Sequence, residues 1–509
     1  MSEPGLALRS PQGRGVIAAT ILGSGMAQLD GTVVNVALPR IGRDLGAGLT
    51  ALQWTVNAYT LTLAGLLLLG GSLGDRLGRR KVFVVGVIWF TVASAGCTLA
   101  PEPATLIAMR ALQGVGAALL TPGSLAILEA VFRPADRAAA VGAWSGLGGI
   151  ATAIGPVLGG VLVGVAPWGW RLVFLINVPM AVAVVALARR YVPETRDEEA
   201  TGRLDVLGAV LAAGGLALAV YALTEGPPQH WPVALVGCLV AGVVVLAGFV
   251  VVEARGSHPM MPLTLFGDRE FTAANIVTFI MYAALGGALF LIPVQLQRVS
   301  GYAPVAAGSA LLPITAVMLL LSARMGRVAQ RIGPRWPMTV GPIVAGVGLA
   351  LLTRVGAHAS YLTDLLPALL VFSLGLSATV APLTATALAS APARLVGVAS
   401  AVNNDIARVA GLLAVAVLPG IAGITPEAYR NPSELSDGFH HAVLIAGGLA
   451  VFGGLLSALL VRRKGESNLA TPDEPEQPQA PDGSSPDDAG ADTPPPRAAC
   501  PILAPHAGS

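Results

Sequence analysis

Two charged residues lie inside long apolar stretches of the chain, Asp30 and Arg110. An ionisable group within a bilayer is costly, so it usually serves the function of the protein. A helix rises ~1.5 Å per residue, so Asp30 lies ~12 Å and Arg110 ~9 Å from the outer ends of their apolar stretches. The two side chains could therefore lie at a similar depth and contact each other. A guanidinium would keep the carboxylate ionised, whereas desolvation would favour its protonation. The pattern predicts proton coupling by Asp30 and Arg110, in which Asp30 binds and releases the proton and Arg110 pairs with its ionised form; a structural ion pair without proton transfer is the alternative.

The composition indicates the elements that position this pair. Of 509 residues, 54% are hydrophobic and 12% are charged, about half the charge typical of a soluble protein. A net charge of +2 gives no basic footprint for nucleic acid. Cys97, Cys238 and Cys500 are too far apart for a disulfide framework or a CxxC metal site. We therefore expect an all-α integral membrane protein that is not an enzyme and has no metal site.

Apolar blocks long enough to cross a bilayer recur along the chain. The expected spans are 16–38, 51–72, 82–100, 104–130, 138–164, 170–190, 205–224, 233–252, 272–296, 304–323, 338–356, 363–389, 397–424 and 440–461. No cleavable signal peptide is expected, because the polar residues 1–15 lead directly into a full-length span. The segment 465–509, rich in Pro, Ala and Asp, is expected to be a disordered tail.

Arginine clusters follow the second, sixth and tenth expected spans. Lys and Arg collect in short cytoplasmic loops. The distribution therefore predicts a multi-pass protein of the cytoplasmic (inner) membrane, with residues 1–15 and the tail both in the cytoplasm.

One segment of the chain is repeated. The loop after the second span reads GSLGDRLGRR from Gly71 to Arg80, and some 255 residues later the chain reads GRVAQRIGPR from Gly326 to Arg335. The repeat divides the chain into a six-helix half (16–190), a two-helix insert (205–252) and a second six-helix half (272–461). Parallel halves with a site between them are typical of transporters. The same offset aligns apolar residues with the charged pair, so proton chemistry is expected in the first half alone.

Other polar residues give weaker signals. Asp405 and Arg408 lie three residues apart on one helix, which favours a structural ion pair over a substrate contact. Glu129 is expected to be an interfacial charge, and His440 and His441 have no further ligand at metal-binding spacing. No Walker motif is present in the sequence, so ATP-driven transport has no support.

Five motifs occur in a fixed order along the chain. They are the loop Gly71, Asp75, Arg76, Gly78, Arg79 and Arg80; the stretch LDGTVVNVALP from Leu29 to Pro39; LQWTVNAY from Leu52 to Tyr59; RALQGVGAA from Arg110 to Ala118; and Gly155, Pro156, Gly159 and Gly160. Together they resemble the major facilitator superfamily, and specifically the 14-span drug:proton antiporters of the EmrB/QacA type, over about residues 16–461.

The resemblance implies a major facilitator fold with fourteen transmembrane helices. It implies that the Gly71–Arg80 loop is a cytoplasmic gate that latches the halves together, and that Gly155 to Gly160 form an antiporter motif. Residues that could line the cavity are Asn35, Trp54, Tyr59, Gln113, Asn403 and Asn404.

The expected function is efflux of hydrophobic or amphipathic small molecules in exchange for protons. The proton gradient would supply the energy without a cofactor, and the partners would be the substrate, protons and the lipid bilayer, with the chain acting as a monomer. Few acids lie in the spans, which favours neutral or monocationic substrates. The alternatives are a dedicated exporter of one self-made compound, an uptake symporter, and a non-transporting membrane sensor or scaffold.

Overall fold

The computed structural model describes residues 5–197, 204–256, 259–392 and 395–461. Its regular elements are all helices within these ranges, and fourteen helical segments are long and apolar enough to cross a membrane. The predictions of an all-α fold and fourteen spans are therefore confirmed. Residues 1–4 of the expected N-terminal segment and the expected tail 465–509 lie outside the described residues.

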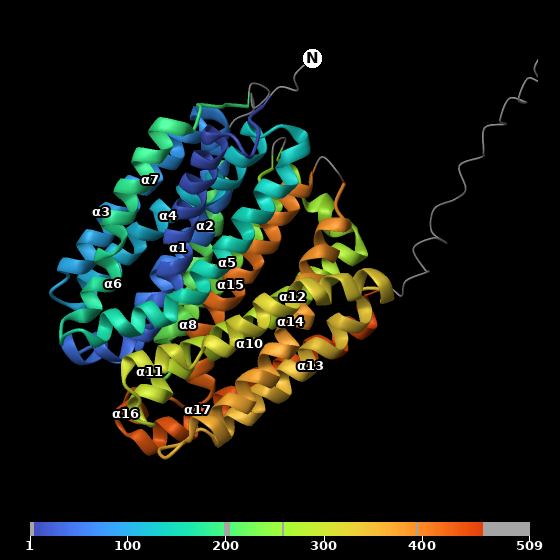
Figure 1. The fold of residues 1–509 in the computed structure, drawn as a ribbon. Helices are drawn as coiled ribbons and strands as arrows, with labels where there is room; N and C mark the ends of the chain where they lie inside the picture. Colours follow the sequence, from blue (N-terminus) through green and yellow to red (C-terminus); the bar gives the residue numbers. More distant parts are fainter. Residues whose placement is uncertain (1–4, 198–203, 257–258, 393–394, 462–509) are drawn as a thin grey trace, which may run out of the picture. The chain divides into compact units, whose positions relative to one another are not determined.

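The first half contains six spans (Figure 1). Its helices are α1 (Pro11–Asp44), α2 (Leu49–Leu77), α3 (Arg79–Leu99), α4 (Pro103–Val131), α5 (Pro134–Gly164), and the sixth span made of η1 (Gly169–Arg171), α6 (Leu172–Leu175) and α7 (Asn177–Tyr191). Most helices extend beyond the expected spans into the flanking sequence. For α1, the Ser10 hydroxyl accepts from Gly13 N–H, and Pro11 occupies the first turn, where its missing N–H costs nothing.

The second half repeats this plan. Its helices are η2 (Leu263–Gly267), α10 (Arg269–Arg298), α11 (Pro304–Ser309), α12 (Leu312–Ile332), α13 (Arg335–Leu351), η3 (Leu352–Arg354), η4 (Tyr361–Leu365), α14 (Leu366–Ala389), α15 (Val396–Ile421), α16 (Pro426–Arg430) and α17 (Pro432–Leu460). The sequence repeat has a structural counterpart, because α2 and α12 both end at a glycine of positive φ. These are Gly78 at +110° and Gly333 at +89°, a region that favours glycine.

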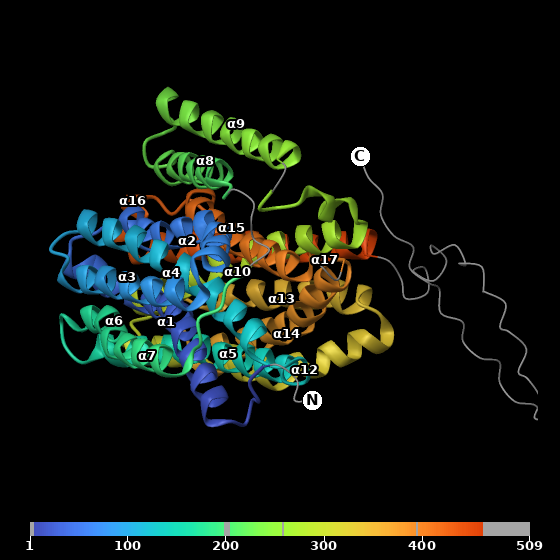
Figure 2. The same cartoon turned by 90° about the horizontal axis from the view of Figure 1, so that it is seen from above.

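The insert is a helical hairpin of α8 (Val206–Glu225) and α9 (Val233–Arg255). In Figure 2, α8 lies beside α2 and α15 on one side of the bundle, and α9 packs on the outer side of α8. An apolar cluster joins Leu216 and Val220 of α8 to Leu61 of α2 and to Leu412 and Ala416 of α15. The insert therefore covers a seam between the two halves.

Candidate functional site

The carboxylate of Asp30 and the guanidinium of Arg110 form an ion pair inside the first half. Arg110 Nη1 donates to Asp30 Oδ2. Neither side chain is exposed by more than 1%. The two groups thus meet between α1 and α4, as their similar depths along the two spans predict.

The other oxygen of the Asp30 carboxylate is also hydrogen-bonded. Gln113 Nε2 donates to Asp30 Oδ1 at 2.9 Å, and Asn177 Nδ2 donates to the same oxygen at 3.3 Å. Both amides also lie within hydrogen-bonding distance of Ser94 Oγ, at 2.7 Å and 3.3 Å. Side chains of α4 and α7 therefore stabilise the ionised carboxylate, with Ser94 of α3 beside both amides. Protonation would remove one of its acceptor positions.

The Arg110 side chain is held by further contacts. Its Nε donates to the carbonyl of Thr55 at 2.9 Å, and its Nη1 donates to Gln113 Oε1 at 2.7 Å. The ring of Tyr59 lies beneath the guanidinium, 4.3 Å from Cζ to ring centroid, at cation–π distance. The Tyr59 hydroxyl in turn donates to the carbonyl of Ala27 at 3.0 Å. Tyr59 and Gln113, expected to line a cavity, instead support the ion pair.

Sequence reasoning missed Ser94, Asn177 and Thr55 as members of this network. The available signal was that Ser94 and Asn177 are polar residues within apolar blocks, which is typical of a functional or packing role in a bilayer. Which polar residues meet depends on the packing of α3 and α7 against α4 and α1. No sequence spacing encodes that packing.

The second half has different polar contacts at its core. Asn403 is buried and its Nδ2 donates to Asn275 Oδ1 and Thr278 Oγ1, each at 3.0 Å. Its neighbour Asn404 is exposed and donates to the carbonyl of Ser400 at 3.2 Å. Of these two residues expected to line a cavity, Asn403 is therefore buried in hydrogen bonds and only Asn404 is exposed. The residues that align with Asp30 and Arg110 are Leu285 and Leu365, consistent with a charged pair in the first half only.

The structural ion pair expected between Asp405 and Arg408 is not formed. No ion pair joins these two described residues, and both Asp405 Oδ1 and Arg408 Nε are buried without a hydrogen-bond partner. The prediction from i, i+3 spacing was wrong because neighbouring positions on a helix allow contact but do not require the side chains to turn toward each other.

The Gly71–Arg80 segment, expected to be a loop, is helical except for Gly78, because α2 ends at Leu77 and α3 begins at Arg79, and it packs against its own half. Asp75 pairs with Arg79 at 2.8 Å, and Arg80 approaches Glu194 at 3.6 Å. The backbone N–H of Arg79 donates to the carbonyl of Thr195 at 2.9 Å. Asp75 therefore has an ion-pair partner within the first half, on the next helix along the chain.

The small residues from Gly155 to Gly160 allow close helix packing. A Cβ on Gly155 would lie 2.0 Å from Thr32 Oγ1 of α1, and one on Gly159 would lie 2.7 Å from Val33. On another side of α5, a Cβ on Gly160 would lie 2.5 Å from the carbonyl of Pro304 in the second half. Likewise, a Cβ on Gly308 of α11 would lie 2.1 Å from the carbonyl oxygen of Pro156 in α5. The motif thus packs α5 against both halves.

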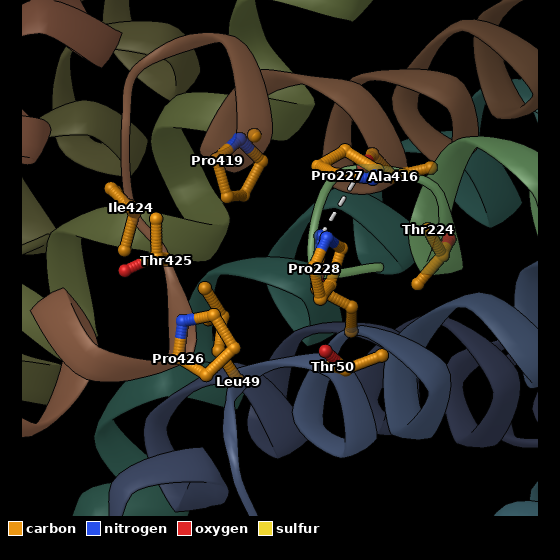
Figure 3. A pocket seen from close by; sticks show the side chains of 12 residues that line it. Leu49, Thr50, Thr224, Pro227, Pro228, Ala416, Pro419, Ile424, Thr425 and Pro426 are labelled. Carbon is orange, nitrogen blue, oxygen red and sulfur yellow. Dashed lines mark hydrogen bonds between the residues drawn. The ribbon is translucent and has the colours of Figure 1, made fainter. Parts of the chain in front are cut away.

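Hydrogen bonds join the halves at the end where α1 ends and α2 begins. Gln53 Nε2 donates to the carbonyls of Val415 and Ala416 at 2.7 and 3.3 Å, and Gln297 Nε2 donates to the carbonyl of Val36 at 2.9 Å. Figure 3 shows the adjoining pocket of about 100 Å³, lined by prolines of the insert and of the α15–α16 region. The halves are therefore closed against each other at this end.

The remaining expected residues occupy varied positions. Trp54 faces the insert, where its Nε1 donates to Glu225 Oε1 at 2.9 Å. Asn35 is half-buried and its Oδ1 has no hydrogen-bond partner. Glu129 is exposed at the last turn of α4, and His440 contacts the carbonyl of Val355 at 3.2 Å. The part of the chain that the structure describes contains no cluster of three metal-ligating side chains.

A family model for the Major Facilitator Superfamily matches residues 20–416. The chain belongs to this superfamily. It is 37% identical over 404 residues to the tetracenomycin C resistance and export protein of Streptomyces glaucescens, covering 79% of this chain and 74% of that protein. It is 37% identical over 418 residues to the multidrug resistance protein Stp of Mycobacterium tuberculosis, and the match covers 82% of this chain and 77% of that protein.

The fold of the superfamily is also found among solved structures. A bacterial homologue of the human lysosomal transporter Spinster, in an inward-facing and unoccupied conformation, matches with a TM-score of 0.66 at 17% identity, covering 89% of this chain and 97% of that one. The resemblance inferred from the motifs is therefore confirmed. As a member of the superfamily, this chain is a transporter of small molecules across a membrane rather than an enzyme.

Proposed function

We propose that this chain exports hydrophobic or amphipathic small molecules, antibiotics among them, in exchange for protons by alternating access. One relative named above is a resistance and export protein and the other a multidrug resistance protein, which supports efflux and the associated drug resistance. The observation that carries proton coupling is the buried Asp30–Arg110 ion pair with its two amide donors. The membrane would be the cytoplasmic membrane, both termini would be cytoplasmic, and the chain would act as a monomer without a cofactor.

The geometry of the pair suggests how a proton could drive the cycle. As a carboxylate, Asp30 accepts hydrogen bonds from α4 and α7 and holds them against α1. Protonation would convert one acceptor oxygen into a donor and cancel the attraction to Arg110. These changes would loosen the contacts among three helices of the first half. The membrane potential adds about 2.3 kcal/mol per charge for each 100 mV.

A dedicated exporter of one compound is the second candidate. The Streptomyces relative is named for resistance to, and export of, a single antibiotic, whereas the Mycobacterium relative is named for multidrug resistance. The number of compounds exported by one cell line expressing this chain distinguishes the two.

The test is efflux of the neutral hydrophobic dye Nile red from cells expressing the wild type or Asp30→Asn, with and without a protonophore. We expect wild-type efflux to collapse with protonophore and with Asp30→Asn. The matched control is Asp437→Asn, which neutralises an exposed carboxylate of α17 and should leave efflux unchanged. Efflux that survives both protonophore and Asp30→Asn would contradict proton coupling through Asp30. Failure to export any member of a wider antibiotic panel would favour the sensor or scaffold.

A further inference from the structure

The helix α15 carries two charged side chains at mid-depth in the membrane. Asp405 and Arg408 lie ~14 Å and ~18 Å along α15 from Val396 at ~1.5 Å per residue, near the middle of a hydrocarbon core about 30 Å thick. Both side chains are half-buried, and the neighbouring Asn404 is exposed. Because α15 contacts α10 in its own half and α2 in the other, these charges lie on a helix that borders both halves.

Unlike Asp30 and Arg110, these two groups have unused hydrogen-bonding atoms. Asp405 Oδ1 and Arg408 Nε are each buried with no hydrogen-bond partner. A buried donor or acceptor left unpaired costs about 1–3 kcal/mol, and more when the group is charged. An ionisable residue at this depth is normally retained for function. An unpaired donor and an unpaired acceptor three residues apart on one helix therefore indicate a binding site for a ligand that supplies both partners.

The surroundings of Arg408 extend this site across the interface. The helix that carries Arg408, α15, packs against α10 of its own half and against α2 of the other half, and these two helices carry Tyr282 and Tyr59. Tyr59 is the residue whose ring lies beneath Arg110. A ligand bound at Arg408 would thus lie on a helix that contacts both halves.

We propose that Asp405 and Arg408 bind the polar group of the exported molecule, and that the preferred substrate is a dipolar, net-neutral amphiphile. An oxygen of a carboxylate or similar anionic group would accept from Arg408 Nε, and an ammonium or iminium cation would lie beside Asp405 Oδ1. The site carries one positive and one negative charge. A simple cation is attracted by Asp405 but repelled by Arg408, and a simple anion is attracted by Arg408 but repelled by Asp405, so only a dipolar molecule is attracted by both side chains. The inference rests on the proposed efflux function and names the substrate class.

The test uses two dyes that differ in one charge, rhodamine B, a zwitterion, and its ethyl ester, a cation. Binding of each to the purified full-length protein in lipid nanodiscs is measured by fluorescence anisotropy. We expect the wild type to bind rhodamine B at least about tenfold more tightly than the ester, the factor supplied by one hydrogen bond to a charged group. Arg408→Gln should abolish this preference by weakening rhodamine B binding about tenfold while leaving or improving ester binding.

Two further variants complete the test. Asp405→Asn should weaken binding of both dyes, because each carries the cationic xanthylium. Arg430→Gln, which changes an exposed arginine of α16, should leave both affinities unchanged. The elution profile and thermal unfolding of each variant show whether it is folded. If Arg408→Gln is unfolded, Arg408→Lys replaces it. This variant keeps the positive charge but lacks the Nε donor, so it should lose part of the preference for rhodamine B.

Equal wild-type affinities for the two dyes, or a preference that survives Arg408→Gln, would overturn the assignment. This outcome is distinct from failure of the proposed function, because Nile red efflux tests transport separately. A protein that exports Nile red and does not discriminate between the rhodamines is an exporter whose substrate site lies elsewhere.

Discussion

Gln113 bridges both members of the buried ion pair, since its Nε2 donates to Asp30 Oδ1 at 2.9 Å while its Oε1 accepts from Arg110 Nη1 at 2.7 Å. One amide therefore fixes the carboxylate and the guanidinium relative to each other. Because Gln113 lies three residues after Arg110, it shares the same face of α4. The buried amide thus belongs to the ion-pair network rather than to a substrate cavity.

Gln113→Leu removes both of these hydrogen bonds while keeping an apolar side chain of similar length. We expect a loss of about 1–3 kcal/mol in stability, because Asp30 and Arg110 each lose a partner in a buried site, and a fall of about tenfold or more in the initial rate of dye efflux. Thermal unfolding in detergent and efflux from cells measure the two effects. Thr91→Val is the control, because the Thr91 hydroxyl donates only within its own helix, to Val87. An unchanged efflux rate in Gln113→Leu would show that the amide does not support coupling.

Gly160→Val places a branched side chain where α5 meets Pro304 of the second half, and a Cβ there already lies 2.5 Å from the Pro304 carbonyl. We expect the added side chain to push α5 away from α11, so that the two halves separate where these helices meet and the transport cycle stalls. Gly149→Val is a matched control on the same helix, because a Cβ at Gly149 has no neighbour within 4 Å. Efflux rates of the two variants at equal expression give the comparison. Equal rates would argue against tight closure of α5 on α11.

The glutamines at the closed end provide a second route to open it. Gln53→Leu together with Gln297→Leu removes the hydrogen bonds from these side chains to backbone carbonyls of the opposite half. Each is worth about 0.5–1.5 kcal/mol, so we expect the closed end to open more often. A cysteine at Thr50, which lines the adjoining pocket, should then react severalfold faster with an impermeant maleimide in a background lacking the native cysteines. Gln229→Leu, at an exposed site, should leave the labelling rate unchanged.

Gly78→Ala tests the turn of the repeated loop. The residue has φ of +110°, and a Cβ would lie 2.6 Å from Glu194 Oε1. We expect a loss of about 1–3 kcal/mol from backbone strain and a lower midpoint of thermal unfolding. Gly74→Ala, in the last turn of α2 with open space around its Cβ position, should be neutral or slightly stabilising because alanine favours helix. If Gly78→Ala unfolds at the wild-type temperature, the turn is not under this constraint.

Much of the architecture could be predicted from local pattern. Apolar block length gave the fourteen spans, because a helix must bury about twenty apolar residues to cross a bilayer. The sequence repeat aligns Gly78 with Gly333, and both glycines form turns of positive φ at equivalent places in the two halves. Helix rise alone placed Asp30 and Arg110 at a common depth. These features depend on properties of one helix or one turn at a time.

Other side chains could not be assigned in this way. Trp54 was expected in a cavity, yet α8 of the insert packs on α2 and supplies Glu225 as its partner. Asp405 and Arg408 have the spacing of an ion pair but do not form one. In both cases the partner of a side chain depends on which helix packs against its face of the helix. That packing is determined by segments far apart in the sequence.

The sequence by itself determined that this protein spans a membrane fourteen times, consists of two related halves around an insert, and buries one acid and one base in its first half. Only the tertiary structure decided that Ser94 and Asn177 complete the network around Asp30, that Gln53 and Gln297 close one end, and that Asp405 and Arg408 retain unpaired atoms. The physical reason is that hydropathy and helical periodicity act along the chain, whereas hydrogen bonds between buried side chains depend on how separate helices rotate and pack against one another.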